Sequence, residues 1–526
     1  MRAVFHLLIA LFTTFTSSGF LCGATLTGLV VDASSMDPVA ARVYVHDSSG
    51  NYCLVKSKSG TAIPYEKERT DQCFEIHTTV SAHPFHVELH ADKYTITVEH
   101  GKEYFTATHE VTVPTNEDVS VVIPLKRWTN MAAKGWYSGE THVHREVDEL
   151  PTLQIAEDLN VAFPLTAWVT DSLHTPATNN RSTRQIPPAK LVQIDKAHVY
   201  WPINTEYELF SVRGNRHTLG AVFVLNHQDQ LELSAPPVGP IAREARRQGG
   251  FLELDKHNWP WSMMLIPQMD VELYELTNNH IWRTEFLYGD WYPEYAAPYM
   301  NIEMGNGRFT ERGWVNFGFE NYYALLNSGF KLQPTGGTAS GVHPVPFGYG
   351  RVYVKIDGDF SYEKWIDGLL AGHSFVTTGP MLTTSARRIT NDRVKVAGKL
   401  ESATKPLGVE IIVNGRVAKS VPLATLQNDN GSYQMAIDTT LDLKGSCWIA
   451  VRAFCRHSDN RFNFAHTAPV YFDVPERPLR PSRQQRDYLA GRVRDEIERS
   501  RSMLTEDQLR EFESALKTYE SLATSD

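Results

Sequence analysis

Apolar and polar residues alternate along the first quarter of the chain. The alternation extends over residues 25–127 and is clear at 42–46, 94–99 and 119–123. Turn-forming residues such as those at 47–50 separate the alternating runs. Short strands with regular turns are typical of a β-sandwich, in which one face of each sheet is apolar. We therefore expect residues 25–127 to form a small β-sandwich.

The pattern changes over residues 128–383. Apolar runs become continuous there, as at 221–225, and stretches of helical character such as 239–249 separate them. Strands that are apolar on both faces are buried between layers, which predicts a parallel α/β sheet or barrel. Alternation returns over residues 384–474, for example at 409–415, and predicts a second β-sandwich.

Residues 475–526 begin with a linker rich in proline and arginine and end in a helical pattern. Thr505 and Gln508 have the spacing of a capping box. One apolar stripe follows them, formed by Leu509, Phe512, Leu516 and Tyr519. We expect this stripe to dock on the rest of the protein, with a partner interface as the alternative. The chain is thus expected to be a multidomain α/β protein with a helical tail.

The N-terminal segment 1–24 has the pattern of a secretory signal peptide. Arg2 gives it a positive start, an apolar stretch follows from Val4 to Phe15, and Cys22-Gly23-Ala24 offers a cleavage site. A lipoprotein cysteine at Cys22 is the alternative, although Phe20 and Leu21 fit it poorly. We expect the protein to be secreted or periplasmic. No later stretch reaches 18 uninterrupted apolar residues, so no stable membrane span is expected in the mature protein.

Composition places the chain among globular proteins and argues against nucleic acid as a partner. Hydrophobic residues make up 42% and charged residues 21% of the 526 residues, and the formal net charge is -10. A length of this size suggests several domains. No block of lysine and arginine forms the basic stripe that a nucleic acid would require.

The cysteines predict disulfides if the chain is exported. Beyond Cys22, the sequence contains Cys53, Cys73, Cys447 and Cys455, which allow three pairings. Short separations in an oxidising compartment favour Cys53–Cys73 and Cys447–Cys455, with unpaired buried thiols as the alternative. None of these cysteines lies in a CxxC motif, so the sequence does not indicate cysteine-bound zinc.

The segment His142-Val143-His144 is a candidate for metal binding. Residues two apart in a strand point to the same side, so both imidazoles can face one cation. Polar residues that can bind a cation or a substrate lie at the ends of later apolar runs: Asp171, Glu206, Glu208, His217, His227, Asp255, His257, Asn279, His280 and His343. Because strand ends meet at one face of a β/α barrel, these side chains are expected to converge.

Residues 135–144 (GWYSGETHVH) resemble the GWYxGDLHxH opening motif of PHP-type metallohydrolases, the polymerase and histidinol phosphatase superfamily, and especially its carbaryl-hydrolase-like CehA/McbA branch. Further similarities occur in the same order as in that branch: Val169-Thr170-Asp171, the Glu206 and His217 pair, Gly249-Gly250 with His257, and the segments 322–329, 351–354 and 372–382. Residues 28–32 and 38–43 resemble carboxypeptidase-regulatory or transthyretin-like sandwiches.

The resemblance implies a distorted PHP-type barrel at residues 128–383, flanked by the two sandwiches. It implies hydrolysis of a small-molecule phosphoester, carbamate or amide by water activated on a divalent metal ion, for which imidazole-rich ligation suits zinc, manganese or iron. The expected metal ligands are His142, His144, Glu206, His217, His257 and His343. Asp171 and Asp255 are expected to act as a general base or to orient a ligand, and substrate contacts are assigned to Arg145, His174, Asn279 and His280.

Two departures from the family pattern change the expected metal content. Ser172 follows Asp171 where the family has histidine, with His174 two residues later, and Ala339 stands at the aspartate position of a closing GxDxH pattern. These departures favour a mononuclear or dinuclear site over a trinuclear one. The alternative is a decayed, metal-free barrel that binds a ligand at the cell envelope, for which the 11 tryptophans and 22 tyrosines would suit carbohydrate.

Overall fold

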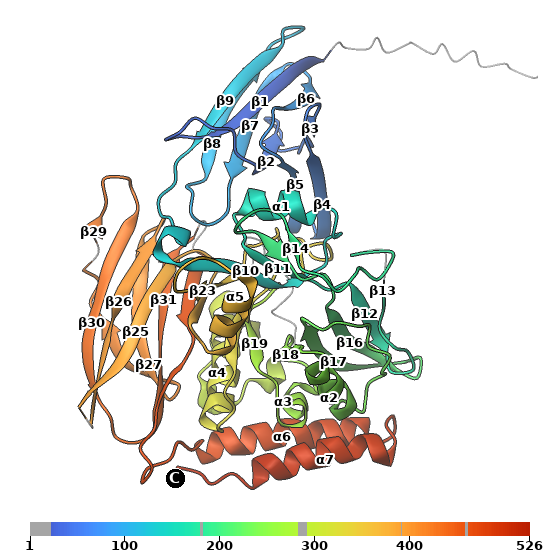
Figure 1. Cartoon of the computed structure of the whole chain (residues 1–526), viewed down its shortest axis with the longest axis vertical. Coiled ribbons are helices and arrows are strands. Elements are labelled where there is room, and N and C mark those ends of the chain that lie inside the picture. The colour runs from blue at the N-terminus through green and yellow to red at the C-terminus, as the bar shows by residue number, and fades with distance from the viewer. Residues whose placement is uncertain are drawn as a thin grey trace, which may run out of the picture.

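A computed structural model describes residues 23–178, 182–281, 292–390, 392–424, 426–457 and 461–525. The N-terminal sandwich lies at one end of the molecule and the two tail helices at the other, with the C-terminal sandwich beside the central region (Figure 1). The expected signal segment lies outside the described residues except for Gly23 and Ala24, and Ala24 begins strand β1.

The N-terminal sandwich consists of two sheets around one apolar core. Alternate residues of each strand are buried, for example Leu26 and Val30 of β1 and Ile96 and Val98 of β7. One sheet has the order β3 (Lys56–Ser57), β6 (Phe85–Leu89), β1 (Ala24–Asp32), β9 (Val119–Leu125). The other has the order β4 (Ala62–Thr70), β5 (Cys73–Val80), β2 (Ala41–His46), β7 (Asp92–Glu99), β8 (Ala107–Val113).

Two sheets make up the central region. The first contains β14 (Val192–Gln193), β15 (Val199–Tyr200), β11 (Val161–Pro164), β10 (Trp136–Val143), β23 (Arg351–Lys355) and β24 (Ser374–Thr377). The second has the order β13 (Ala177–Thr178), β12 (Ala167–Asp171), β16 (Thr205–Val212), β17 (Asn215–Leu225), β18 (Phe251–Leu254), β19 (Leu273–Thr277), β22 (Gln333–Gly336). The two sheets meet where Val143 bridges Ser340, just beyond β22.

Helices and short elements cover these sheets. The α-helices are α1 (Leu150–Glu157), α2 (Gly239–Arg247), α3 (Ser262–Met269), α4 (Glu311–Asn327) and α5 (Tyr362–Leu370). The short elements are η1 (Ala132–Lys134), η3 (Pro293–Tyr295), η4 (Pro298–Met300), β20 (Met304–Gly305) and β21 (Arg308–Phe309).

The strand directions in the central region are mixed. Parallel pairs are β10 with β11, β12 with β16, β18 with β19, and β19 with β22. In contrast, β17 runs antiparallel to both β16 and β18. β16 and β17 form a hairpin whose turn, Arg213-Gly214, has positive φ at both residues. A two-residue turn of this kind joins antiparallel strands, whereas parallel strands need a long crossover. The uniformly parallel sheet expected from the continuous apolar runs is therefore wrong at β17.

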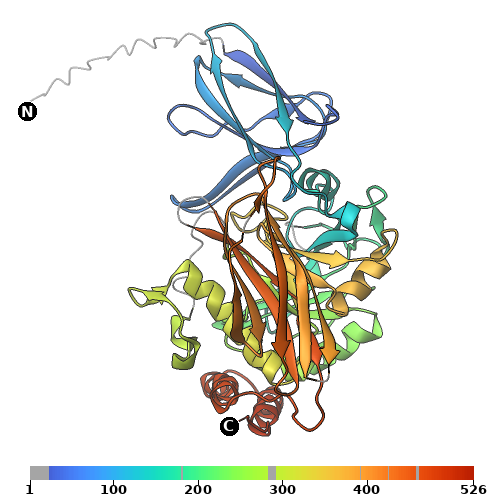
Figure 2. The same cartoon turned by 90° about the vertical axis from the view of Figure 1, so that its left-hand side faces the viewer.

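The C-terminal sandwich is continuous with the first central sheet, because β24 pairs with β32. Figure 2 looks onto its long strands. One of its sheets contains β25 (Met381–Thr390), β26 (Arg393–Ser402), β30 (Tyr433–Asp442) and β29 (Leu426–Gln427). The other contains β32 (Phe462–Thr467), β31 (Cys447–Arg456), β27 (Pro406–Val413), β28 (Arg416–Val421) and β33 (Val470–Phe472).

No disulfide joins Cys53, Cys73, Cys447 and Cys455 in the described part of the chain, which corrects the expected pairings. Cys447 and Cys455 lie on the same strand, β31, eight residues apart. At about 3.3 Å per residue their Cα atoms are roughly 26 Å apart, whereas a disulfide needs a separation below about 7 Å. Closeness in sequence is misleading within a single strand.

The tail helices α6 (Arg483–Ser500) and α7 (Glu506–Glu520) pack against the central region, at the bottom of Figure 1. The Thr505–Gln508 capping box is formed at the start of α7. The Tyr519 hydroxyl donates to the backbone carbonyl of Met263 on α3 at 2.7 Å. The apolar stripe thus docks within the chain. Among the described helices, none combines the length and apolar character that a membrane crossing requires.

Candidate metal centre

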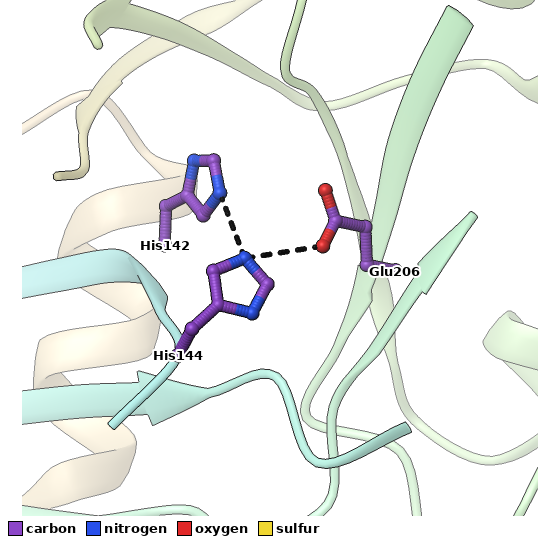
Figure 3. Close-up of side chains that lie close together, drawn as sticks. All are labelled: His142, His144 and Glu206. Atoms are coloured by element: carbon purple, nitrogen blue, oxygen red, sulfur yellow. Dashed lines mark hydrogen bonds and ion pairs between the residues drawn. The ribbon is translucent and has the colours of Figure 1, made fainter. Parts of the chain in front are cut away.

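His142 and His144 lie at the end of β10, where the two central sheets meet. Both side chains are buried, and Figure 3 shows the two imidazoles and the Glu206 carboxylate pointing toward one another. His144 Nε2 lies 3.3 Å from His142 Nε2 and 3.2 Å from Glu206 Oε2. Alternation along β10 puts both imidazoles on one side, as the HxH spacing predicts.

Glu206 reaches the histidines from the other sheet. It lies on β16, opposite Trp168 of β12 and Phe223 of β17. The Phe223 ring contacts the His142 ring edge to face, with a centroid distance of 4.6 Å. This aromatic contact removes water from one side of His142.

Glu275 on β19 fixes the orientation of the His142 ring. His142 Nδ1 lies 2.9 Å from Glu275 Oε1, and Asp255 Oδ1 lies 3.7 Å from the same nitrogen. In the tautomer with the proton on Nδ1, His142 directs the lone pair of Nε2 toward His144 and Glu206. A carboxylate that holds a histidine in this way is a common feature of metal ligation. The proton between the two Nε2 atoms is one that a metal cation would replace.

A glycine makes this arrangement possible. A Cβ at Gly337 would lie 2.2 Å from His142 Cβ and 2.5 Å from Glu275 Oε1. Any other residue at this position would push apart the His142–Glu275 pair.

The titratable groups form three overlapping sets whose ligand atoms all lie within 4.8 Å of one another within each set. The sets are His142, His144 and Glu206; His142, Asp255 and Glu275; and Glu206, Glu208 and Asp255. Burial raises the pKa of Glu208 and of Glu275 well above the ordinary value, and neighbouring carboxylates add to the rise. Burial also acts to raise the pKa of Asp255, but the Lys256 ammonium, His142 and hydrogen bonds from Glu275 and Lys256 together outweigh it and hold this pKa below the ordinary value.

The side chains of this cluster fit a divalent cation. Asp255 Oδ1 and Glu275 Oε2 are buried and accept from no nitrogen or hydroxyl of the described residues, although the two carboxyl groups share a hydrogen bond with each other. Buried carboxylate oxygens without a donor are costly unless a cation compensates them. Imidazole nitrogens combined with carboxylate oxygens suit zinc, manganese or iron.

Of the six predicted ligands, the structure brings together His142, His144 and Glu206. His217 lies near the opposite end of β17, where its ring nitrogens contact Ser500 Oγ at 2.8 Å and the Arg499 guanidinium at 3.3 Å. Six residues of extended strand separate it from Phe223, which is about 20 Å. The geometry therefore separates His217 from the cluster.

His257 and His343 lie outside the three sets of described residues. The His257 ring lies against Tyr274, Trp314 and Phe317, and neither of its nitrogens has a hydrogen-bond partner among the described residues. Burial lowers the pKa of His257 to about 3. His343 Nδ1 lies 2.8 Å from Arg69 Nη2, on a loop that the N-terminal sandwich contacts.

The two predicted catalytic aspartates have different surroundings. Asp255 belongs to the cluster. Asp171 accepts hydrogen bonds from Ser211 Oγ and from the backbone N–H groups of Leu173 and Gly214, so it stabilises the turn beyond β12.

The predicted substrate contacts are dispersed. The His174 side chain is 74% exposed, and Arg145 is paired with Glu149 at 2.8 Å and lies over the Tyr65 ring. Asn279 is buried with both side-chain amide atoms unpartnered, and His280 is buried against Trp314.

Glu275 and Lys256 are the site residues that the sequence reasoning missed. The signal for Glu275 was an acidic residue inside the apolar run Leu273-Tyr274-Glu275-Leu276. A carboxylate in a fully buried strand requires a partner, and the HxH motif offered one.

The fold and the site define a mixed α/β protein with a buried histidine and carboxylate cluster compatible with a metal-dependent hydrolase. No family model matches the chain, and no curated protein matches it. One solved structure is similar: a two-domain protein from Bacteroides vulgatus that contains a predicted PHP-like metal-dependent phosphoesterase. The similarity has a TM-score of 0.28 and 10% sequence identity, and covers 64% of this chain and 96% of that one.

Proposed function

We propose that the chain is an exported metal-dependent hydrolase of the PHP type, whose His142, His144 and Glu206 hold a divalent cation. The observation that carries the proposal is the contact between His142 Nδ1 and Glu275 Oε1, because it directs the free lone pair of His142 toward His144 and Glu206. A carboxylate at Nδ1 sets the tautomer of a ligating histidine, and at His142 the other nitrogen, Nε2, faces a second imidazole and lies in one candidate ligand set with Glu206.

A bound divalent cation would lower the pKa of its water toward ~7 and polarise the bond to be cleaved. The cluster supplies groups that could handle the proton of that water. Asp255, which Lys256 keeps ionised, is the proposed proton acceptor. Glu275 holds His142 in place. The proposed substrates are small molecules with a phosphoester, carbamate or amide bond.

The test is the metal content of the full chain, purified without chelator or histidine tag and measured by plasma mass spectrometry. We expect metal in the wild type and its loss in His142→Ala and His144→Ala. His217→Ala is the control, because it removes a partly buried histidine from the same region without touching the cluster. Metal retained by both cluster variants would refute the proposed site, as would a wild type that binds none after incubation with zinc or manganese.

A further inference from the structure

We propose that the ammonium group of Lys256 takes the place of a second divalent cation, so that the centre accepts one metal ion. This inference rests on the proposed function, because it concerns how many ions the same cluster can bind. It assigns a role to a residue that neither the HxH motif nor the family resemblance indicates.

Lys256 is fixed inside the cluster. It follows Asp255 directly after β18, and its side chain is 3% exposed. Its Nζ is in contact with Asp255 Oδ2 and lies 5.8 Å from the centre of the Trp259 ring. The Lys256 carbonyl accepts hydrogen bonds from Trp259 N–H and from the Ser262 hydroxyl. A lysine anchored at its backbone and paired at its tip has little freedom to leave.

The surrounding charge is that of a cation site. Burial acts to lower the pKa of Lys256, yet Asp255, Glu208, Glu275 and Glu206 together raise it above the ordinary value. Three of these carboxylates, those of Glu206, Glu208 and Asp255, form one of the three sets of potential ligands. Carboxylates this close repel one another unless a positive charge lies among them. Lys256 supplies that charge from within the chain.

The consequence concerns metal stoichiometry. The set formed by His142, His144 and Glu206 contains both imidazoles and stays available for a metal ion. The set formed by Glu206, Glu208 and Asp255 contains only oxygen ligands, and the ammonium, in contact with Asp255, already offsets part of its negative charge. A second divalent ion would have to approach a fixed positive charge, which a low-dielectric interior makes unfavourable.

The experiment compares wild type with Lys256→Met, which removes the charge at similar length, and Lys256→Arg, which retains it. Each full-length protein is stripped with chelator, incubated with excess Mn²⁺, and dialysed. Bound manganese is counted by mass spectrometry, and electron paramagnetic resonance distinguishes isolated from spin-coupled Mn²⁺ pairs. We expect one ion in wild type and Lys256→Arg, and two in Lys256→Met with a spin-coupled signal.

Two ions in the wild type would overturn the inference, as would one ion in a folded Lys256→Met protein. Circular dichroism checks folding, and Lys256→Gln replaces the methionine variant if that one does not fold. Failure of the proposed function has a different signature: no manganese in any of these proteins. A further outcome is that the wild type binds no metal and Lys256→Met binds one ion. That result would support the role of Lys256 as a substitute for a cation and would refute the proposal that the wild type depends on a metal.

Discussion

His142 and His257 are both fully buried histidines of the central region, yet their surroundings are opposite. His142 has a carboxyl group at 2.9 Å, whereas the His257 ring lies among aromatic rings and forms no hydrogen bond within the described part of the chain. Adjacent residues of β19 create the difference: Glu275 contacts His142, and Tyr274 stacks on His257. Because successive side chains of a strand point to opposite faces, β19 separates a charged cluster from an aromatic layer. Burial alone therefore does not distinguish the two histidines; His142 differs in having a carboxyl group at Nδ1 and a second imidazole at Nε2.

The largest effect on the difference between His142 and His257 is expected when the carboxyl group that orients His142 is removed. Glu275→Gln replaces the carboxyl group that lies 2.9 Å from His142 Nδ1 with an amide, and the loss of such a partner typically weakens metal binding by about 10–100-fold. Isothermal titration calorimetry of the metal-stripped protein with zinc measures the change in zinc affinity.

Glu253→Gln is the matched control. Glu253 is also a fully buried glutamate, and burial raises its pKa to about 8. Its Oε1 accepts from the hydroxyls of Thr141 and Thr335 at 2.8 Å, which a glutamine oxygen can also do. We expect nearly unchanged zinc affinity in this variant. Equal weakening in both variants would mean that the replacement of any buried carboxyl group by an amide, and not the orientation of His142, controls metal binding.

Some features of the fold and of the cluster could be predicted from the sequence and others could not. Alternating residues in 25–127 and 384–474 predicted sandwiches, because a sheet with one solvated face imposes that period. The HxH motif is also local, so His142 and His144 were found. Glu275 and Lys256 depend on which strands become neighbours, and a single sequence does not contain that information. His217 and His257 follow the same kind of pattern as true cluster members, but strand direction and strand face place them elsewhere.

A second, smaller effect concerns pH. Burial lowers the pKa of His257 to about 3, from about 6.5 in an unfolded chain. Between these two values the unfolded state binds more protons, so the stability that neutral His257 contributes is complete above pH ~6.5 and declines as pH falls toward 3. His257→Phe removes this proton linkage while keeping an aromatic ring. Between pH 6.5 and 5 we expect the variant to lose about 2 kcal/mol less stability than wild type.

Thermal unfolding of metal-free protein at several pH values measures this difference. His174→Phe, at a histidine whose side chain is mostly exposed, is the control for replacing an imidazole with a phenyl ring. Identical pH dependence in wild type and His257→Phe would show that His257 is not held neutral by the aromatic layer.

The smallest effect is expected where the N-terminal sandwich contacts the loop beyond β22. The Tyr65 hydroxyl of β4 donates to the His343 carbonyl and accepts from the Gly341 N–H at 2.9 Å, and the same loop pairs with the HxH segment through the bond from His144 N–H to Ser340 O at 2.8 Å. Tyr65→Phe leaves two backbone groups without this partner, which costs about 1–3 kcal/mol. Because no ligand of the cluster loses a contact, we expect a lower melting temperature with zinc affinity changed by less than about twofold, against roughly 10-fold or more for Glu275→Gln.

Tyr52→Phe, a partly buried tyrosine of the same sandwich whose ring packs on Phe74, serves as the control for loss of a hydroxyl. In the contrary outcome, Tyr65→Phe would lower zinc affinity as much as Glu275→Gln does. That result would contradict the separation of the charged cluster from the loop that supports it, and the N-terminal sandwich would then count as part of the metal centre.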